Sequence, residues 1–143
     1  MMIALANDHG GFELKEEIKN KLEKEGYDVV DLGAYNEESV DYPIYGKKCA
    51  EEVASKNAEK GIVICGSGIG ISIAANKVKG IRCALCTSVE MAKLAAKHNN
   101  ANVLALGGRL TEKKLAFEIV DAWLNTEFEG GRHEKRVELL DNM

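Results

Sequence analysis

Short apolar runs alternate with longer helix-like segments along most of the chain. Five runs have the length of a buried strand, at residues 3–6, 27–32, 62–65, 81–86 and 103–106. Segments with helical patterns lie between and after them, at residues 12–25, 44–55, 71–77, 88–97 and 111–125. This alternation predicts a three-layer α/β/α fold, in which helices cover both faces of a Rossmann-like parallel sheet of five strands. A further segment, residues 132–140, predicts an extra C-terminal helix.

Composition favours one folded domain over residues 1–143. A hydrophobic content of 45% can supply a core, and a single proline with no low-complexity tract argues against disorder. The net charge of -4 gives no general attraction to nucleic acid or to an anionic membrane. No apolar stretch approaches the roughly 20 residues of a membrane span and no leader segment is predicted, so we expect a soluble, cytoplasmic protein. The cysteines, at positions 49, 65, 83 and 86, are expected to be free thiols.

The stretch of residues 61–77 carries the strongest chemical signal. An apolar run ends at Cys65, and a glycine-rich loop, GSGIG at residues 66–70, leads into the next predicted helix. Glycines let a ligand approach the backbone, and the free N–H groups at a helix start attract an anion. Cys65 would sit at the mouth of this anion site, where the same partial positive charge stabilises a thiolate.

Other polar residues follow the first and fifth predicted strands. Asp8 and His9 come after the first strand, and Arg109 follows two glycines after the fifth. Ligands in open α/β sheets bind beyond the carboxyl ends of the strands. We therefore expect an acid, an imidazole, the Cys65 thiol and a guanidinium to meet at one edge of the sheet.

Several other interpretations of the glycine loop are open. Such a loop after a strand is also a common structural turn in α/β proteins. A nicotinamide site would need an acidic residue at the end of the next strand, which instead ends Cys86-Thr87-Ser88. A cysteine phosphatase would need an arginine six residues after Cys65, where the chain has Ile71. Both of these enzyme classes are therefore disfavoured.

The remaining histidines and arginines each have a structural and a functional interpretation. His98 is either a partly buried histidine on the core stripe of its helix or an acid at the helix C-terminus, where the dipole favours the protonated imidazole. His133 by itself is typical of a surface residue. Arg132 and Arg136 lie one helical turn apart and either belong to a solvated helix end or join Arg109 in a phosphate clamp.

The Cys83-x-x-Cys86 pattern favours no metal or redox site. Within a predicted strand the two side chains point to opposite faces. Cys49, on a predicted helix, is expected to serve packing.

Motifs along nearly the whole chain, taken together, resemble those of ribose-5-phosphate isomerase type B. They are Asp8-His9-Gly10-Gly11-Phe12, Asp41-Tyr42-Pro43, Cys65-Gly66-Ser67-Gly68-Ile69-Gly70, His98-Asn99, Gly107-Gly108-Arg109, and Arg132-His133 with Arg136. The same family includes galactose-6-phosphate and allose-6-phosphate isomerases. The resemblance therefore leaves open a hexose 6-phosphate as the substrate.

The resemblance implies an interconversion of ribose 5-phosphate and ribulose 5-phosphate through a cis-enediolate, with no metal or other cofactor. It implies that Cys65 is the base between C2 and C1 and that His98 is the acid that opens the sugar ring. Asp8 would hold sugar hydroxyls, and Ser67, at a position that is often threonine in the family, would help to move a proton between O1 and O2. The implied binding residues are His9, Tyr42, Gly66, Gly68, Ile69, Gly70, Asn99, Arg109, Arg132, His133 and Arg136.

The resemblance also implies an assembly, because the family is dimeric with sites built from both subunits. We therefore expect a homodimer, with a tetramer as the larger possibility. The alternative from another functional class is a non-catalytic module that binds a nucleotide or phosphate on the same scaffold.

Overall fold

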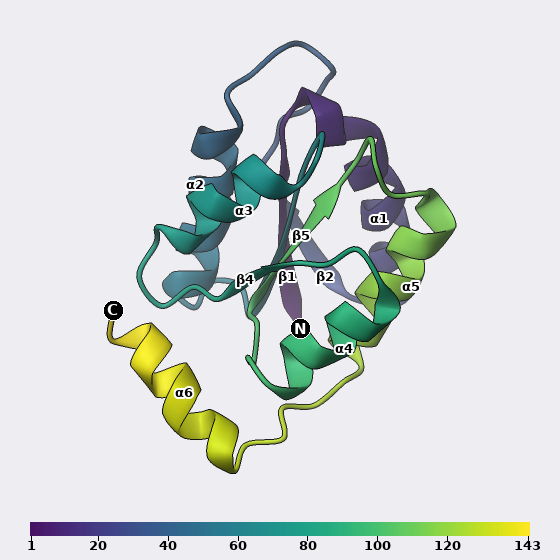
Figure 1. Ribbon diagram of the computed structural model, residues 1–143. Coiled ribbons are helices and arrows are strands. Elements are labelled where there is room, and N and C mark those ends of the chain that lie inside the picture. The colour runs from purple at the N-terminus through teal and green to yellow at the C-terminus, as the bar shows by residue number, and fades with distance from the viewer.

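The computed structural model describes residues 1–143 and confirms the predicted alternation (Figure 1). A short 3-10 turn, η1, follows the first strand. The elements are β1 (Met2–Asn7), η1 (His9–Gly11), α1 (Phe12–Lys24), β2 (Asp28–Asp31), α2 (Tyr42–Ala54), β3 (Lys60–Cys65), α3 (Ile69–Asn76), β4 (Cys83–Leu85), α4 (Val89–Lys97), β5 (Val103–Gly107), α5 (Lys113–Leu124) and α6 (Arg132–Asp141).

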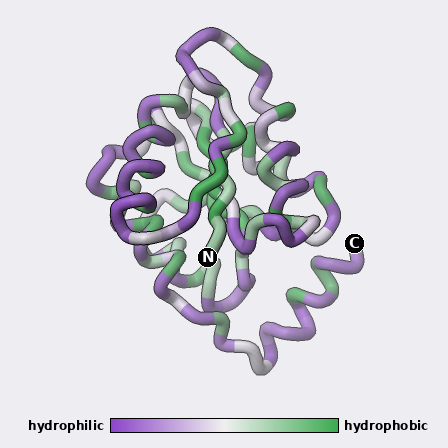
Figure 2. Tube along the Cα trace, turned by 180° about the vertical axis from the view of Figure 1, so that it is seen from behind, coloured by the Kyte–Doolittle hydropathy of each residue, from purple (hydrophilic) through white to green (hydrophobic).

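The strands form one parallel sheet in the order β2-β1-β3-β5-β4. Alternate residues of each strand face opposite helix layers, as the period of a strand requires. Ile62 and Ile64 of β3 pack with α1, α4 and α5, whereas Val63 and Cys65 pack with α2 and α3. The predicted three-layer α/β/α fold is thus confirmed, and Figure 2 shows the hydrophobic residues concentrated along the central strands.

Most boundaries of the strands and helices differ by one or two residues from the pattern in the sequence. The apolar runs at residues 27–32 and 81–86 become the short edge strands β2 and β4, because an edge strand has a hydrogen-bonded neighbour on one side only. Helix α2 starts at Tyr42, with the lone proline in its first turn, where a missing N–H costs nothing. Helix α3 starts at Ile69, two residues before the expected start, so the last two residues of the GSGIG segment belong to its first turn.

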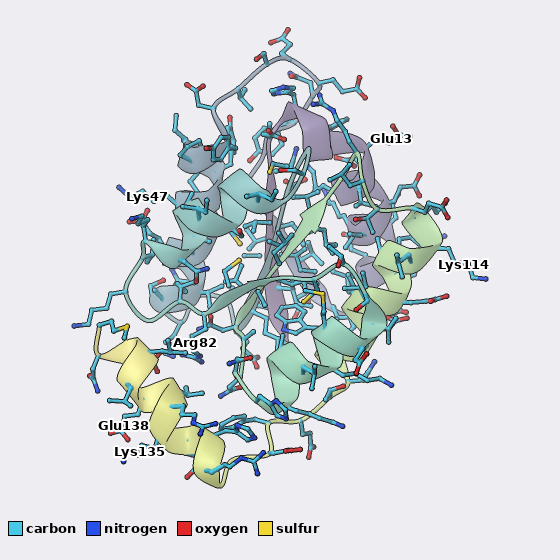
Figure 3. The ribbon with its side chains drawn as sticks, viewed as in Figure 1. Glu13, Lys47, Arg82, Lys114, Lys135 and Glu138 are labelled. Atoms are coloured by element: carbon cyan, nitrogen blue, oxygen red, sulfur yellow. The ribbon has the colours of Figure 1, made fainter.

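Helix α6 lies beside the three layers instead of within them (Figure 1). Only His133 and Val137 of this helix are buried. A salt bridge of 2.6 Å joins Nη1 of Arg82 to Oδ1 of Asp141, and Arg82 lies between the sheet and α6 (Figure 3). No helix of the protein has the combination of length and hydrophobicity that a membrane-spanning segment needs.

Candidate active site

Cys65 ends β3 with its side chain in contact with its own loop. The N–H of Gly68 donates a 3.2 Å hydrogen bond to Sγ of Cys65. Gly68 has a φ of +81° and is the residue directly before α3, so the backbone turns back over the sulfur at this point. The thiol is 4% exposed, which places it in the wall of the site instead of on an open surface. The sulfur thus accepts a hydrogen bond from the loop that leads into α3.

Arg109 lies against the glycines of two other loops. A Cβ built at Gly66 would be 3.2 Å from Nη1 of Arg109, and one built at Gly10 would be 3.3 Å from its Cζ. The backbone N–H of Arg109 also donates a 3.0 Å hydrogen bond to the carbonyl oxygen of Gly66. These glycines therefore leave the room that the guanidinium occupies beside Cys65.

Asp8 and His9 are held at the end of β1 by backbone contacts. The buried Asp8 accepts a 3.1 Å hydrogen bond from the N–H of Gly11 and so caps the turn η1. Nδ1 of His9 accepts a 3.2 Å hydrogen bond from the N–H of Val40. In the neutral ring this leaves the proton on Nε2, which can donate to a ligand.

An open cavity of about 610 Å³ joins the ends of β1, β3 and β5. The ring of Tyr42 closes one side of it, because a Cβ at Gly70 would be only 2.6 Å from Cε1 of that ring. The expected convergence of acid, thiol and guanidinium at the carboxyl ends of the strands is confirmed, whereas the imidazole of His9 is not among the lining residues. The lining residues are Asp8, Tyr42, Cys65, Gly66, Ser67, Ile69, Gly70, Arg109 and Leu110. Leu110 was missed in the sequence, where only its position next to Arg109 pointed to it.

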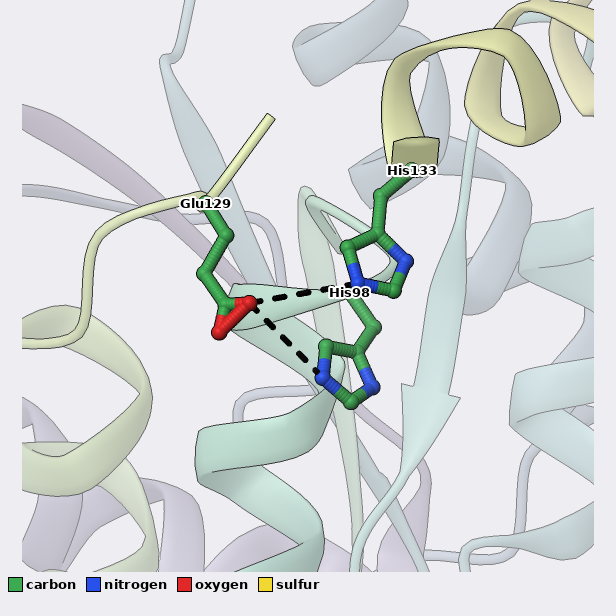
Figure 4. Close-up of side chains that lie close together, drawn as sticks. All are labelled: His98, Glu129 and His133. Carbon is green, nitrogen blue, oxygen red and sulfur yellow. Dashed lines mark ion pairs between the residues drawn. The ribbon is translucent and has the colours of Figure 1, made fainter. Parts of the chain in front are cut away.

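A second cluster forms where α4 ends and α6 begins. The rings of His98 and His133 stack with centroids 4.2 Å apart and an interplanar angle of 14°. Nε2 of each ring faces Oε2 of Glu129, at 4.0 Å from His98 and 3.9 Å from His133 (Figure 4). Glu129 was not found from the sequence, since it belongs to no motif.

The burial of these two histidines differs from what the sequence suggested for each. His133 is only 6% exposed, so the surface position suggested by the sequence is wrong. Its burial, the neighbouring His98 and the guanidinium of Arg132 lower the pKa of His133. The side chain of His98 is 37% exposed at the C-terminus of α4, and the core stripe of that helix is formed by alanines instead. Asn99, Arg132 and Arg136 lie exposed at the same end of the molecule.

Within one chain these two clusters lie at opposite ends of the parallel strands. The Cys65 cavity lies at the carboxyl ends, and the His98 cluster lies at the amino ends. The segment after His98 reaches the start of β3, where the N–H of Gly61 donates a 3.0 Å hydrogen bond to the carbonyl oxygen of Asn102. Cys65 ends the same strand four residues later, or about 13 Å away at about 3.3 Å per residue. Arg109 therefore lines the Cys65 cavity, whereas Arg132 and Arg136 belong to the His98 cluster.

The other cysteines lack the setting of Cys65. All four thiols are free, as expected. Burial raises the pKa of Cys49 to about 12 and that of Cys86 to about 11, and burial also raises the pKa of Cys83. Cys83 and Cys86 pack on opposite faces of the sheet, as the strand period predicted. These thiols serve packing.

Known proteins are similar to this chain in sequence and in fold. A model of the ribose/galactose isomerase family matches residues 3–140. Ribose-5-phosphate isomerase B of Escherichia coli strain K12 is 49% identical over 138 residues, which cover 96% of this chain and 93% of the relative. The chain belongs to the ribose/galactose isomerase family. It is therefore an isomerase, and the non-catalytic alternative is set aside.

Further relatives extend this comparison to a hexose phosphate enzyme and to solved structures. The galactose-6-phosphate isomerase subunit LacB of Clostridium acetobutylicum is 40% identical over 147 residues, covering 99% of this chain and 85% of the relative. The structure of Clostridium thermocellum ribose-5-phosphate isomerase B matches with a TM-score of 0.98 at 54% identity, covering 99% of this chain and 96% of that one. The Mycoplasma genitalium enzyme, solved with bound ribulose-5-phosphate, matches with a TM-score of 0.94 at 41% identity, covering 99% and 94%.

Proposed function

We propose that this isomerase interconverts ribose 5-phosphate and ribulose 5-phosphate. The observation that carries the proposal is the hydrogen bond from Gly68 to the Cys65 sulfur in a cavity that also contains Asp8 and Arg109. The names of the relatives from Escherichia coli and Clostridium thermocellum support this substrate, as does the ribulose-5-phosphate bound to the Mycoplasma genitalium enzyme.

The reaction moves a hydrogen between adjacent carbons through a cis-enediolate. The Cys65 thiolate removes the proton from C2 and returns it to C1, a step to which a well-placed base contributes about 10² to 10⁴ in rate. Amides of residues 66–70 hold the oxygens that become negative, and each such donor is worth ~3 to 4 kcal/mol in related sites. Oγ of Ser67 accepts a 3.2 Å hydrogen bond from the N–H of Ile69, so its own proton is free to move between O1 and O2.

The His98 cluster completes the site from a second subunit. His98 and Cys65 are far apart within one chain. A homodimer can place the amino ends of the strands of one subunit, with His98, over the Cys65 cavity of the other. A two-fold axis then creates two equal sites. His98 donates a proton to the ring oxygen and Asn99 binds the sugar, while Asp8 and His9 hold its hydroxyls from the first subunit.

Arginines bind the phosphate, which takes no part in the chemistry. Arg109 approaches from the subunit that supplies Cys65, and Arg132 and Arg136 approach from the partner. Guanidinium groups bind phosphate oxygens bidentately, and this remote binding energy positions C1 and C2. Every step uses a side chain or a backbone amide, so the reaction needs no metal or other cofactor.

Substitution of Cys65 by alanine tests the proposal. We expect turnover of ribose 5-phosphate and exchange of its C2 proton with heavy water both to fall by about 10² to 10⁴. Circular dichroism and the affinity for inorganic phosphate should stay the same. Cys83→Ala is the matched control, because it removes a thiol outside the cavity and should leave turnover unchanged. Normal exchange in Cys65→Ala would contradict the assigned base.

A hexose 6-phosphate is the second candidate substrate. The 40% identity to the galactose-6-phosphate isomerase subunit of Clostridium acetobutylicum favours it. Measurement of kcat/KM on ribose 5-phosphate, allose 6-phosphate and galactose 6-phosphate under the same conditions decides between the pentose and the hexose substrates. A higher kcat/KM on either hexose phosphate would replace the pentose assignment.

A further inference from the structure

The cluster of His98, Glu129 and His133 contains three donor atoms that face one another. One ligand atom from each of the three residues lies within 4.8 Å of the other two, and Nε2 of each ring faces Oε2 of Glu129 (Figure 4). Glu129 comes from the loop before α6, so the donors come from three different segments of the chain. None of the steps proposed for the isomerase uses Glu129.

His133 provides an independent sign that this cluster accepts a ligand. Its side chain is only 7% exposed, and Nε2 has no hydrogen-bond partner. A buried polar atom without a partner costs about 1 to 3 kcal/mol, so a ligand that satisfies it binds with that advantage. Nε2 points toward the carboxylate of Glu129, at 3.9 Å, beyond the length of a hydrogen bond.

We propose that His98, Glu129 and His133 bind a divalent cation of the zinc type, and that the bound cation inhibits the isomerase. Two imidazoles and one carboxylate form a donor set that zinc uses in proteins, with the remaining position open to water. Mg²⁺ and Ca²⁺ prefer oxygen donors alone and should bind poorly here.

Zinc binding requires the three donor atoms to move closer together, and the cluster permits this movement. Donor atoms around a tetrahedral zinc lie about 3.3 Å apart, as follows from metal–ligand distances of about 2.0 to 2.2 Å. The two nitrogens must therefore approach the Glu129 oxygen by about 0.6 to 0.7 Å, and donor atoms that now lie up to 4.8 Å apart must close by about 1.5 Å, so the stacked rings must turn until both lone pairs converge. The side chains of His98 and Glu129 are 37% and 50% exposed, so both have room to move.

The consequence for catalysis rests on the proposed role of His98. A nitrogen that is bound to a metal carries no proton, so Nε2 of a metal-bound His98 cannot protonate the ring oxygen. The guanidinium groups of Arg132 and Arg136 lie close by and repel a cation. This repulsion keeps the affinity below that of a permanent structural site, and the inhibition is reversible by a chelator.

The test measures metal binding directly and activity separately. Calorimetric titration of the whole protein with ZnCl₂ should show one Zn²⁺ per chain, and CoCl₂ should give the visible absorption of a Co²⁺ ion with fewer than six ligands. Glu129→Gln should weaken Zn²⁺ binding by more than ~10-fold, since even the loss of an outer partner of a metal ligand costs that much. Glu127→Gln, in the same exposed loop, is the matched control and should bind Zn²⁺ as the wild type does.

Activity measurements complete the test. Zn²⁺ should inhibit the wild type and Glu127→Gln equally, and Glu129→Gln should require more than ~10-fold more Zn²⁺ for the same inhibition. MgCl₂ should inhibit none of them. Equal Zn²⁺ binding by Glu129→Gln and the wild type, binding that disappears in Cys65→Ala, or saturation by Zn²⁺ without loss of turnover would each overturn the proposal. Zn²⁺ binding with no turnover of any sugar phosphate would instead contradict the proposed function and leave the metal site standing.

Discussion

The N–H of Gly68 reaches the sulfur of Cys65 because Gly68 has a φ of +81°, which no other residue type adopts readily. A Cβ at this position would also lie 2.7 Å from Cδ1 of Leu85 and 2.8 Å from the carbonyl carbon of Leu106. We expect Gly68→Ala to lower the free energy of unfolding by about 1 to 3 kcal/mol and to lower kcat, because the amide must move away from the sulfur. Urea denaturation and steady-state kinetics measure the two effects.

Gly26→Ala is the matched control for Gly68→Ala. Gly26 has a φ of +90°, and a Cβ there would meet no atom within 4 Å. This variant carries the same kind of backbone strain at the end of α1, far from the cavity, and should lose about 1 kcal/mol of stability with kcat unchanged. A similar loss of kcat in both variants would show that the hydrogen bond to Cys65 has no catalytic role.

Hybrid dimers test whether each site takes Cys65 from one subunit and His98 from the other. A dimer of one Cys65→Ala chain and one His98→Asn chain then has one site with both defects and one site with neither. Random pairing of equal amounts makes about half of the dimers hybrid, so co-refolding of the two inactive variants should restore roughly a quarter of the wild-type activity.

The control for this experiment pairs Cys65→Ala with Ser67→Ala. Both residues line the same cavity of one chain, so no arrangement of these two variants creates an intact site. Activity should then stay at the level of the separate variants. Recovery in this control, or no recovery in the Cys65 and His98 pair, would rule out the composite site.

Arg136 is expected to act on binding more than on the chemical step. Arg136→Ala removes a charged hydrogen-bond donor to the phosphate, so KM should rise about 10- to 100-fold with a smaller change in kcat. The inhibition constant of inorganic phosphate should rise by a similar factor. Lys135→Ala, an exposed neighbour on α6, should change neither constant. An unchanged KM in Arg136→Ala would remove this residue from the phosphate site.

Lys15 supports the loop between β2 and α2 from inside the protein. Its side chain is fully buried, with Nζ 2.7 Å from Oδ2 of Asp31 and 3.1 Å from the carbonyl oxygen of Ala34. Lys15→Met leaves the carboxylate of Asp31 without its principal partner, and we expect a loss of about 3 kcal/mol in unfolding free energy. Lys19→Met, which removes the partly exposed second partner of Asp31, should cost less than about 1 kcal/mol. Urea denaturation compares the two.

The same ion pair predicts a dependence of stability on pH. Burial of Asp31 opposes its ionisation, but the hydrogen bonds from Lys15 and from the N–H of Gly33 outweigh burial and lower the pKa of Asp31 below 3.8. The folded state then binds fewer protons than the unfolded state, so this stability is present above pH 3.8 and is lost as the pH falls through the lower folded pKa. Lys15→Met should flatten this acid dependence in denaturation curves. If the unfolding free energy of Lys15→Met changed with pH as steeply as that of the wild type, Asp31 would be excluded as the source of the acid dependence.

Local patterns in the sequence were sufficient for the fold and for one half of the candidate site. The alternation of strands and helices depends on periodicity within short segments, and parallel strands necessarily end at the same edge. The sequence therefore predicts that Asp8, Cys65 and Arg109 lie together. The resemblance to an isomerase family rests on motifs along nearly the whole chain, and the match over residues 3–140 confirms it.

Tertiary packing alone determined the other half of the candidate site, the cluster around His98. The stacking of His98 on His133, the approach of Glu129 to His98 and the burial of Lys15 all depend on how segments far apart in the sequence pack together. No short-range period encodes such contacts. The order of the strands and the return of α4 to the amino ends of the strands also separate His98 from Cys65 within one chain. A sequence pattern does not reveal this separation, because it carries no information on the distance between elements.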